Sequence, residues 1–498
     1  MASTIKTSRN CYFVVCVFTL SFVNVAWPQT ATDETFGAKL RRLAAAAEIS
    51  NPLTEHPLRP ASAWAPTRAY VQGEVVQNGQ NIYLCYTSGT SAASGGPAGT
   101  GYSGIVDGTV VWFYNGPSVV NIPDPSAPTI SATANFATLT SLGLTKSYNP
   151  VDSPSSFSFG GGVPTRQQNA KLVSFPAVHA SANDTGGNIG FNNGTNNYYW
   201  SATFVTDAPI VAISVSFGGS PANIIIDGRR LFPGGYKGPS AQTAFILDFT
   251  RAGGRKSRTI TLEDYGNIRF AGVTVDVGSI VSAPFASDRV RVAFLGSSIE
   301  AGGNGFPMLG MPHWPEGASK LLGWTDPWNL GLGGTGYIAN AQGKSLNYMT
   351  HIADAISISP DIVVVGGPIN DVNYPSSQLV TAAVSLLHRL RAALPKVPLL
   401  VMGAFSADRW PSTANLNSEL AVKNAVQQLN DPNIFFIPLI SGQDGSVISG
   451  TSRVTSPNGT GNSDFYLSSD GHPTQLGINH LSVQYATKIR SVFVNLLK

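Results

Sequence analysis

A serine-containing turn follows a strongly apolar segment in the second half of the chain. Residues 290–302 read VRVAFLGSSIEAG, so Ser297 and Ser298 come directly after a predicted strand and before a predicted helix. A serine on such a sharp turn is exposed, and backbone N–H groups of the turn can reach a bound substrate. Glycine and serine are also common in ordinary connections, so the turn indicates a nucleophile only if its chemical partners occur elsewhere.

Three segments further along the chain are expected in loops and carry glycine or polar residues. They are NLGLGGTG at 329–336, GGPIND at 366–371 and SDGHPT at 469–474. Cleavage of an ester or amide by serine requires a base, an acid that orients the base, and hydrogen-bond donors for the developing oxyanion. The three segments contain residue types for each requirement.

The candidate residues divide into three roles. Ser298 is the candidate nucleophile, and His472 and Asp470 are the candidate base and its orienting acid. Gly334 and Asn370 could both donate hydrogen bonds to the oxyanion. Together these residues predict a serine-dependent acyl transfer.

The order of the four segments resembles the blocks of the SGNH, or GDSL-like, hydrolase superfamily. The resemblance covers residues 290–498, about two fifths of the chain, and implies an α/β domain with a parallel sheet in a three-layer, flavodoxin-like arrangement. The interval from Gly296 to Gly302 fits the first block only with Ser298, and not Ser297, as the nucleophile.

The same resemblance implies a mechanism for these positions. Ser298 would attack the acyl carbon, with His472 as general base and then as general acid for the leaving alcohol. The oxyanion would be bound by the backbone N–H groups of Ser298 and Gly334 and by the side-chain amide of Asn370. No cofactor and no metal ion are implied.

Three positions depart from the family pattern. Ser297 replaces the usual aspartate before the nucleophile, and Pro368 replaces the usual glycine two residues before the oxyanion asparagine. Asp470 lies two residues before His472, where the family places its aspartate three residues before, at Ser469. Either Asp470 reaches the imidazole or a backbone carbonyl orients the ring. We favour Asp470, because a carboxylate both fixes the tautomer and stabilises the imidazolium.

Each segment also has a purely structural interpretation. Asp470–Gly471 is a common turn sequence, and Asn370–Asp371 could cap a helix beginning near Pro375. Gly333–Gly334 could simply allow close packing of backbone.

The elements that must position these residues alternate between strands and helices over residues 288–498. The predicted strands are continuous apolar runs, as in a parallel sheet covered on both faces, at 290–295, 362–365, 397–402 and 434–440. Helical periodicity appears at 379–394 and 481–496. This region is therefore predicted to be an open α/β sheet, in which ligands bind beyond the carboxyl ends of the strands.

Residues 130–287 have a different pattern, with many predicted strands and almost no helix. Alternation of apolar and polar residues is clear at 259–263 and 270–277, as in strands with one buried face. These features predict a separate β-sandwich domain of the jelly-roll-like type.

A small β module is predicted at residues 61–120. Its pattern of aromatic residues and glycines resembles the chitin-binding-like carbohydrate modules attached to secreted hydrolases. Trp64, Tyr70 and Trp112 could stack on sugar rings, or they could form the core of a module too small to fold without large side chains.

The N-terminal segment resembles a secretory signal. Lys6 and Arg9 precede the apolar run 11–25, which is short for a membrane span, so residues 1–31 are predicted to be a signal peptide and 32–60 a linker. The alternative is a membrane anchor. After removal of the signal only Cys85 remains of the three cysteines, so no internal disulfide can form.

The composition argues against several classes of binding partner. A net charge of +3 over 498 residues gives no field that would favour nucleic acid or an anionic membrane. The seven histidines show no spacing typical of a metal site. The protein is expected to be secreted or periplasmic, without contact to the membrane once the signal is removed.

The sequence thus predicts a secreted serine esterase that removes acyl groups, most simply acetyl groups, from a polysaccharide or another acylated glycan. Trp324, Trp328 and Trp410 fall in predicted loops and could be sugar platforms or buried anchors. Two alternatives remain: a hydrolase of lipid or short-chain esters, and a non-catalytic polysaccharide-binding protein with a degenerate hydrolase domain.

Overall fold

The computed structural model describes most of the chain after residue 56. The described residues are 57–100, 104–120, 122–167, 171–175, 199–216, 221–239, 241–265, 268–285, 289–302, 311–341, 346–406, 412–442, 446–448, 467 and 471–497. The predicted signal peptide, Asp470 and Trp410 lie outside these ranges. Among the described residues, no helix is both long enough and apolar enough to cross a membrane.

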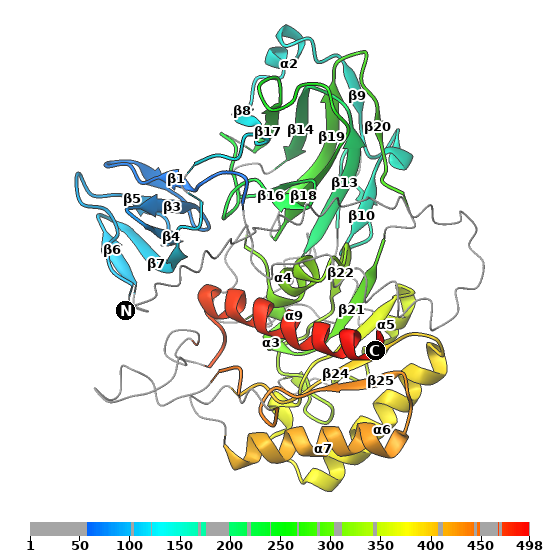
Figure 1. Cartoon of the computed structure of the whole chain (residues 1–498). Helices are drawn as coiled ribbons and strands as arrows, with labels where there is room; N and C mark the ends of the chain where they lie inside the picture. Colours follow the sequence, from blue (N-terminus) through cyan, green and yellow to red (C-terminus); the bar gives the residue numbers. More distant parts are fainter. Residues whose placement is uncertain are drawn as a thin grey trace, which may run out of the picture. The chain divides into compact units, whose positions relative to one another are not determined.

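A five-stranded parallel sheet forms the C-terminal region (Figure 1). Its order is β22 (Asp326–Asn329), β21 (Arg291–Leu295), β23 (Ile362–Val365), β24 (Leu399–Met402) and β25 (Ile434–Ile437). All four predicted strands are present, because continuous aliphatic runs are stable only where both faces of the sheet are covered. The edge strand β22 was not predicted, and it places Trp328 in a strand instead of the expected loop.

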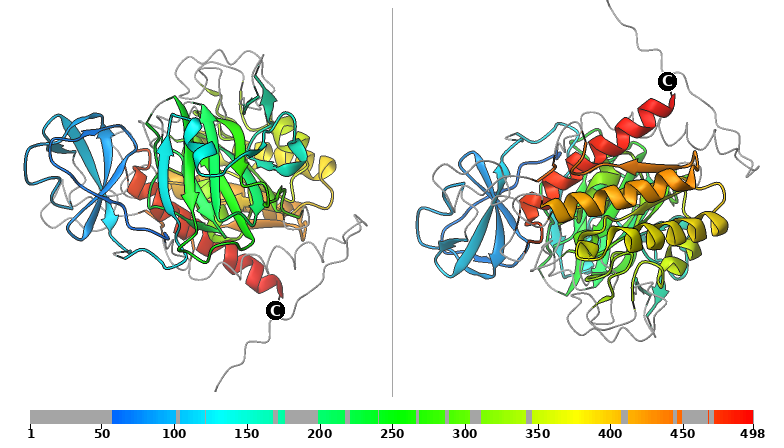
Figure 2. Two further views of the ribbon diagram at one scale, coloured as in Figure 1. Left: turned by 90° about the horizontal axis from the view of Figure 1, so that it is seen from above. Right: turned by 90° about the horizontal axis from the view of Figure 1, so that it is seen from below.

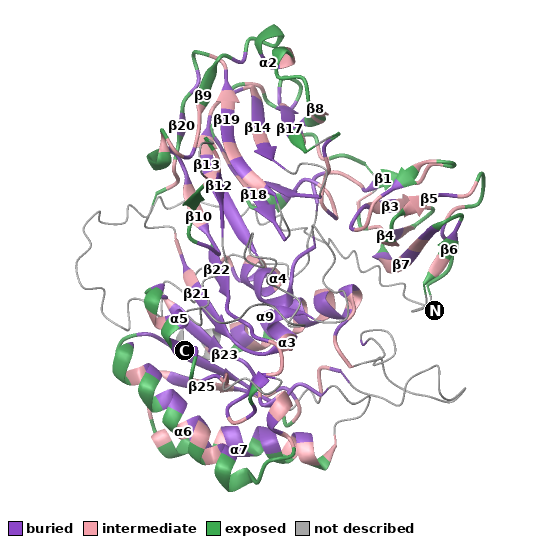
Figure 3. Ribbon diagram, turned by 180° about the vertical axis from the view of Figure 1, so that it is seen from behind, coloured by how far each residue is buried: buried purple, intermediate pink, exposed green. Residues whose placement is uncertain are grey.

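Helices cover both faces of this sheet. Val292 and Phe294 of β21 pack in one core with α4 (Trp314–Leu321) and α9 (Gln475–Leu497). Ala293 and Leu295 point to the other core, with α5 (Ile352–Ser357), α6 (Ser376–Ala393) and α7 (Thr413–Leu429). Figure 2 shows α6 and α7 side by side, and Figure 3 shows the buried strands beside the exposed outer faces of these two helices. Successive side chains of β21 thus alternate between two cores, as the pleat of a strand requires.

Two antiparallel sheets enclose a separate core before this region. One sheet has the order β10 (Ser158–Gly160), β13 (Trp200–Thr206), β18 (Arg258–Asp264), β15 (Asn223–Ile226) and β16 (Arg229–Arg230), with β20 (Val281–Ser282) paired to β13. The other has the order β11 (Thr165–Arg166), β12 (Val173–Ser174), β19 (Arg269–Val275), β14 (Ile210–Ser216), β17 (Gln242–Asp248) and β8 (Thr129–Thr133), with β9 (Lys146–Tyr148) paired to β19. Both strands predicted from alternation, at 259–263 and 270–277, are present as β18 and β19. We call these two sheets and their core the two-sheet region.

Within the described residues of the two-sheet region, the helical segments are short, namely α2 (Ala137–Ser141) and the 3-10 helix η1 (Pro154–Ser156). Figure 1 shows α2 at the end of the strands.

The N-terminal β-sheet is small and is built around aromatic side chains. It has the order β1 (Ser62–Ala63), β3 (Val75–Asn78), β4 (Asn81–Thr87), β7 (Val110–Pro117) and β6 (Ile105–Asp107), and β2 (Ala69–Tyr70) pairs with β5 (Gly89–Thr90). Cys85 of β4 is a buried free thiol, and burial raises its pKa to about 12.

The three aromatic residues singled out in this sheet mainly form its core. Trp112 is 0% exposed and Tyr70 is 2% exposed, with their rings edge to face at 4.9 Å. The indole N–H groups of Trp112 and Trp64 both donate to Asp107, at 3.0 and 2.8 Å. Tyr70 and Trp112 therefore offer no free ring face to a sugar, which corrects that expectation for these two residues; Trp64 is partly exposed.

Candidate active site

The serine turn lies beyond the carboxyl end of β21. Gly296 ends the strand, Ser297 is the N-cap of the short helix α3 (Ser298–Ala301), and Ser298 is the first helical residue. A Cβ at position 296 would stand 2.1 Å from a carboxylate oxygen of Glu300, so only glycine fits there. The N–H groups of a first helical turn have no acceptor within the helix, so the turn exposes backbone donors next to the hydroxyl of Ser298.

His472 lies directly against this serine. Its Nε2 is 2.8 Å from Oγ of Ser298, although 174 positions separate the two residues. His472 stands just before α9, next to Pro473, which bridges to Leu467. The predicted pair of nucleophile and base is thus brought within hydrogen-bond distance. The predicted orienting residue Asp470 lies outside the described residues.

The two predicted oxyanion donors lie on loops that contact each other. Asn370 is in the 3-10 helix η4 (Ile369–Asp371), and its Nδ2 donates to the carbonyl of Thr335 at 2.8 Å. Thr335 follows Gly334, whose φ of 76° favours glycine. The single O–H of Thr335 lies 2.6 Å from the carbonyl oxygen of Leu332 and 3.2 Å from that of Gly296, between which it is shared, and this ties the loop to the serine turn.

Accessibility distinguishes the four described candidates from their surroundings. Ser298, Gly334, Asn370 and His472 are all partly exposed, whereas their neighbours Ser297, Thr335 and Asp371 are buried. A substrate can therefore reach the four predicted residues, while the residues that hold them in place are shielded from water.

Asp371 is a functional residue that the sequence interpretation had assigned only a helix-capping role. Its carboxylate accepts the backbone N–H groups of Tyr337, Ile338 and Ala339 at 2.8, 3.0 and 2.8 Å. Burial raises its pKa, and the three N–H groups act in the opposite direction. Asp371 thus anchors the loop that carries Gly334 and Thr335, and it does not cap α6.

Glu300 is a second buried carboxylate, and the sequence interpretation did not single it out. It is 4% exposed, and its Oε2 accepts the backbone N–H of Ser297 at 2.6 Å. Burial raises its pKa to about 7. The signal was present in the sequence, because serine followed by glutamate three residues later is the capping-box pattern.

Two of the three departures from the family pattern, at Ser297 and Pro368, have local explanations. Ser297 accepts the N–H of Ile299 at 3.3 Å, so it caps α3 as an aspartate would, since both residues are good N-caps. Pro368 has φ −84° and starts η4 without needing the conformational freedom of glycine. The close approach in that loop is made by Gly367, where a Cβ would stand 1.9 Å from the carbonyl oxygen of Gly403.

The structure also places the other residues considered from sequence. Trp324 and Trp328 are each 3% exposed, so they are buried anchors. His388 and His480 lie within α6 and α9, as expected for packing or surface residues. Among the described residues, no three His, Cys, Asp or Glu side chains gather in a way that could hold a metal ion.

Comparison with known families gives a match over the C-terminal region. Residues 294–478 match the GDSL-like Lipase/Acylhydrolase family, and this range includes Ser298, Gly334, Asn370 and His472. The C-terminal parallel sheet with its helices is thus the α/β fold of an SGNH, or GDSL-like, acylhydrolase domain, and it is preceded by antiparallel N-terminal β-domains. No curated protein matches the chain.

Several solved structures resemble the chain at low sequence identity. A salicylyl-acyltransferase, SsfX3, from a tetracycline biosynthetic pathway has 14% identity and a TM-score of 0.47, with 71% of this chain and 99% of the other covered. A family two carbohydrate esterase from Clostridium thermocellum, in complex with cellohexaose, has 15% identity and a TM-score of 0.40, covering 60% and 92%. An acetyl xylan esterase from Butyrivibrio proteoclasticus has 13% identity and a TM-score of 0.40, covering 75% and 100%.

Proposed function

We propose that this chain, whose residues 294–478 match the GDSL-like acylhydrolases, is a serine esterase that removes acetyl groups from a polysaccharide. The observation that carries the proposal is the 2.8 Å contact between His472 Nε2 and Ser298 Oγ on an accessible turn. This is the distance at which an imidazole can take the proton of a hydroxyl during nucleophilic attack.

Acylation begins when the Oγ of Ser298 attacks the acyl carbon of the ester. His472 accepts the hydroxyl proton at Nε2 as the C–O bond forms. The tetrahedral intermediate then collapses, the bond to the sugar oxygen breaks, and His472 returns the proton to the departing alcohol. The product of this half-reaction is an acyl-enzyme at Ser298.

Deacylation repeats these steps with water. His472 takes a proton from the water molecule, whose oxygen attacks the acyl carbon, and then protonates the departing Oγ of Ser298. Asp470 would fix the tautomer of His472 and stabilise the imidazolium during both half-reactions.

The negative charge on the substrate oxygen would be met by three donors. They are the backbone N–H groups of Ser298 and Gly334 and the second N–H of the Asn370 amide, whose first N–H is held by Thr335. Such fixed donors stabilise the transition state because they need no reorganisation as the charge develops.

The remaining assignments belong to the same proposal. The two-sheet region would be a jelly-roll-like β-sandwich domain, and residues 61–120 a carbohydrate-binding-like module, as the sequence resemblance implies. The signal-like segment 1–31 would direct the protein to the periplasm or the exterior, where polysaccharides are accessible.

Hydrolysis of p-nitrophenyl acetate by the purified protein and by Ser298→Ala tests the reaction. We expect the variant to lose activity by about a thousandfold or more, because it removes the hydroxyl that lies 2.8 Å from His472 Nε2. Equal rates for the two proteins would exclude a Ser298-dependent esterase and favour a non-catalytic binding protein.

The acyl group and the glycan are tested separately. We expect acetate release from acetylated xylan, chitin or pectin fragments, and p-nitrophenyl esters with long acyl chains to be poor substrates. A preference for long-chain esters would replace the polysaccharide assignment with that of a lipid ester hydrolase.

A further inference from the structure

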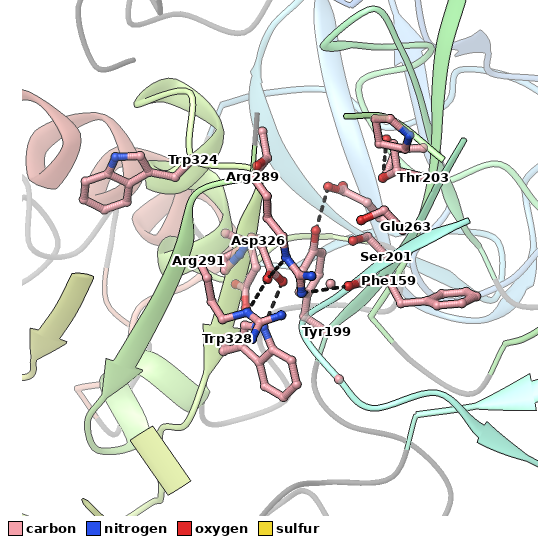
Figure 4. A pocket seen from close by; sticks show the side chains of 18 of the residues that line it. Phe159, Tyr199, Ser201, Thr203, Glu263, Arg289, Arg291, Trp324, Asp326 and Trp328 are labelled. Atoms are coloured by element: carbon pink, nitrogen blue, oxygen red, sulfur yellow. Dashed lines mark hydrogen bonds and ion pairs between the residues drawn. The ribbon is translucent and has the colours of Figure 1, made fainter. Parts of the chain in front are cut away.

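A cavity of about 1100 Å³ lies at the amino ends of β21 and β22, between these strands and the two-sheet region (Figure 4). Arg291 and Asp326, the first residues of the two strands, line it. Ser298 lies beyond the opposite end of β21, about 16 Å away along a five-residue strand at about 3.3 Å per residue. None of the residues placed in the candidate active site lines this cavity.

One wall of the cavity is a ladder of hydroxyl groups. Ser201 pairs with Glu263 and Thr203 with Thr261 across β13 and β18, and the side chains of all four face the cavity. The hydroxyls of Thr203 and Thr261 are 2.9 Å apart. Each hydroxyl can both donate and accept a hydrogen bond, so this wall can bind groups that also do both.

The opposite wall presents guanidinium groups that are already oriented. The Nε atoms of Arg289 and Arg291 both lie 2.6 Å from Oδ2 of Asp326. Arg289 also donates to the carbonyl of Phe159 and Arg291 to that of Ile358. Because a guanidinium has five N–H donors, each arginine keeps donors for a ligand, and their side chains are 34% and 23% exposed.

The charges that line the cavity balance. The cations are Arg289, Arg291 and Lys320, and the carboxylates are Asp227, Glu263, Glu316 and Asp326. Burial raises the pKa of Glu316 to about 8, so that this group is mostly protonated at neutral pH. Three positive and three negative charges remain, which gives no net attraction for an ionic ligand.

Apolar surface completes the lining at the edge of the cavity. Phe285 and Val163 are 72% and 53% exposed, so the cavity is open to solvent there, and the half-buried ring of Phe159 lies further inside. The combination of hydroxyls, fixed donors and aromatic surface fits a sugar, whose hydroxyl groups donate and accept while its C–H faces pack on rings. A lipid chain could not use the hydrogen-bonding capacity that the hydroxyls and arginines keep for a ligand.

We propose that this cavity is a second carbohydrate-binding site, for a neutral oligosaccharide segment, separate from the site at Ser298. Its volume of about 1100 Å³ is slightly above the range of small-molecule sites, about 300–1,000 Å³, which favours several sugar units over one. A segment of polysaccharide held in this cavity would keep the polymer on the protein between reactions. The proposal does not rest on the esterase activity, because binding needs no acyl group.

Calorimetric titration of the full-length Ser298→Ala variant with unacetylated xylo-, cello- and manno-oligosaccharides tests the proposal. At least one should bind, and Thr203→Val/Thr261→Val in the same background should weaken it about tenfold, since two hydroxyl partners are lost with little change in shape. Ser147→Ala/Thr274→Val is the matched control, because it removes another cross-strand hydroxyl pair, at 3.1 Å, from the other sheet.

The control should bind as Ser298→Ala does. A second variant, Thr203→Arg, places a long charged side chain in the cavity and should abolish binding. An unchanged melting temperature and unchanged p-nitrophenyl acetate hydrolysis, measured with Ser298 present, would show that the fold and the serine site are intact. Binding of none of the neutral oligosaccharides, binding of anionic galacturonate fragments alone, or equal affinity with and without the two threonine hydroxyls would each overturn the proposal. None of these three binding results depends on whether the protein hydrolyses esters.

Discussion

Buried carboxylates act at the residue scale as acceptors for backbone N–H groups around the serine turn. Glu300 accepts from Ser297, and Asp371 accepts from three consecutive residues starting at Tyr337. The accessible residues Ser298 and Asn370 thus lie next to carboxylates that are themselves shielded. Buried acceptors of this kind hold a loop more firmly than water-exposed ones, since the N–H groups would be costly to leave unpaired.

Asn370→Ala is expected to lower kcat for p-nitrophenyl acetate about a hundredfold or more, with a smaller change in KM. The amide would donate to charge that exists only in the transition state, so its loss affects the chemical step more than binding. Steady-state kinetics of the variant, beside Asn149→Ala in a partly exposed turn of the two-sheet region, provides the measurement. Equal losses in both variants would contradict a role for Asn370 as a donor.

Glu316 makes the stability of the protein depend on pH. Its pKa is about 8 in the folded chain against 4.5 for an ordinary glutamate, because burial disfavours the charged form. The folded state therefore holds the proton more tightly, and this contribution is full below pH 4.5 and is lost as the pH rises towards 8. Nearby His313, whose pKa burial lowers to about 3, is neutral in that range and supplies no compensating charge.

Glu316→Gln should remove this part of the pH dependence. Relative to the wild type, the variant should gain stability from pH 5 to pH 8, by at most about 1.4 kcal/mol per pH unit. Melting temperatures measured across this interval test the expectation. Parallel curves for the two proteins would mean that Glu316 titrates normally.

At the element scale, loops at the carboxyl edge of the sheet are tied to one another. Asp371 of η4 holds the loop after β22, and Glu419 of α7 accepts N–H groups from Ala404 after β24 and from Leu439, Ile440 and Ser441 after β25. The parallel strands bring these loops to one edge of the sheet. The two carboxylates then fix the distances between the loops.

Asp371→Ala is expected to lower the melting temperature and also kcat, because three buried N–H groups lose their acceptor at about 1–3 kcal/mol each. Asp371→Asn keeps one carbonyl oxygen and should lie between the wild type and the alanine variant in both quantities. Thermal unfolding of the two variants gives their melting temperatures, and steady-state kinetics gives their kcat values. A stability loss without any change in kcat would show that the loop does not position Gly334.

The elements differ in how far the sequence could predict them. β23 was predicted with its observed bounds, because IVVV is a continuous aliphatic run in the middle of the sheet. Helix α7 was missed, since its buried face includes Asn415, Ser418 and Glu419, which break the apolar periodicity. The side chain of Asn415 accepts the backbone N–H of Ser412, and that of Glu419 accepts the backbone N–H of Ala404. Hydrogen bonds of these kinds leave no periodic signal in the sequence.

The site residues were easier to predict than their supports. Ser298 and His472 follow from chemical type and order along the chain, and their contact is present. Asp371 was not assigned its structural role, because its partners are backbone N–H groups, which every residue type except proline carries. Glu300 was overlooked although Ser297 and Glu300 form a capping-box pattern. The sugar-stacking role considered for Trp112 failed for a related reason: sequence alone does not reveal which aromatic residues a small sheet uses as its core.

At the scale of the whole molecule, Asp326 joins the two-sheet region to the parallel sheet. It is 2% exposed and accepts from the backbone N–H of Gly161 at 3.2 Å and from Trp328 Nε1 at 2.8 Å, in addition to Arg289 and Arg291. Arg289 and Arg291 share this one carboxylate, and its negative charge compensates their positive charges. Polar contacts through Asp326 therefore link the two regions.

Asp326→Ala should destabilise the protein by about 3–5 kcal/mol, because it leaves two partly buried guanidinium groups without their counter-ion. The matched control is Asp152→Ala, which removes an exposed ion pair with Lys171 and should leave the melting temperature unchanged. Differential scanning calorimetry of both variants provides the comparison. Similar small effects would indicate that the junction does not depend on Asp326.

The N-cap at Ser297 has a consequence for how such a turn can change over generations. Serine codons that begin with adenine reach aspartate codons by two single-base changes, and the intermediate codon encodes either asparagine or glycine. All four residues are accepted at the start of a helix. A lineage can therefore exchange serine and aspartate before the nucleophile without passing through an ancestor whose helix start was uncapped.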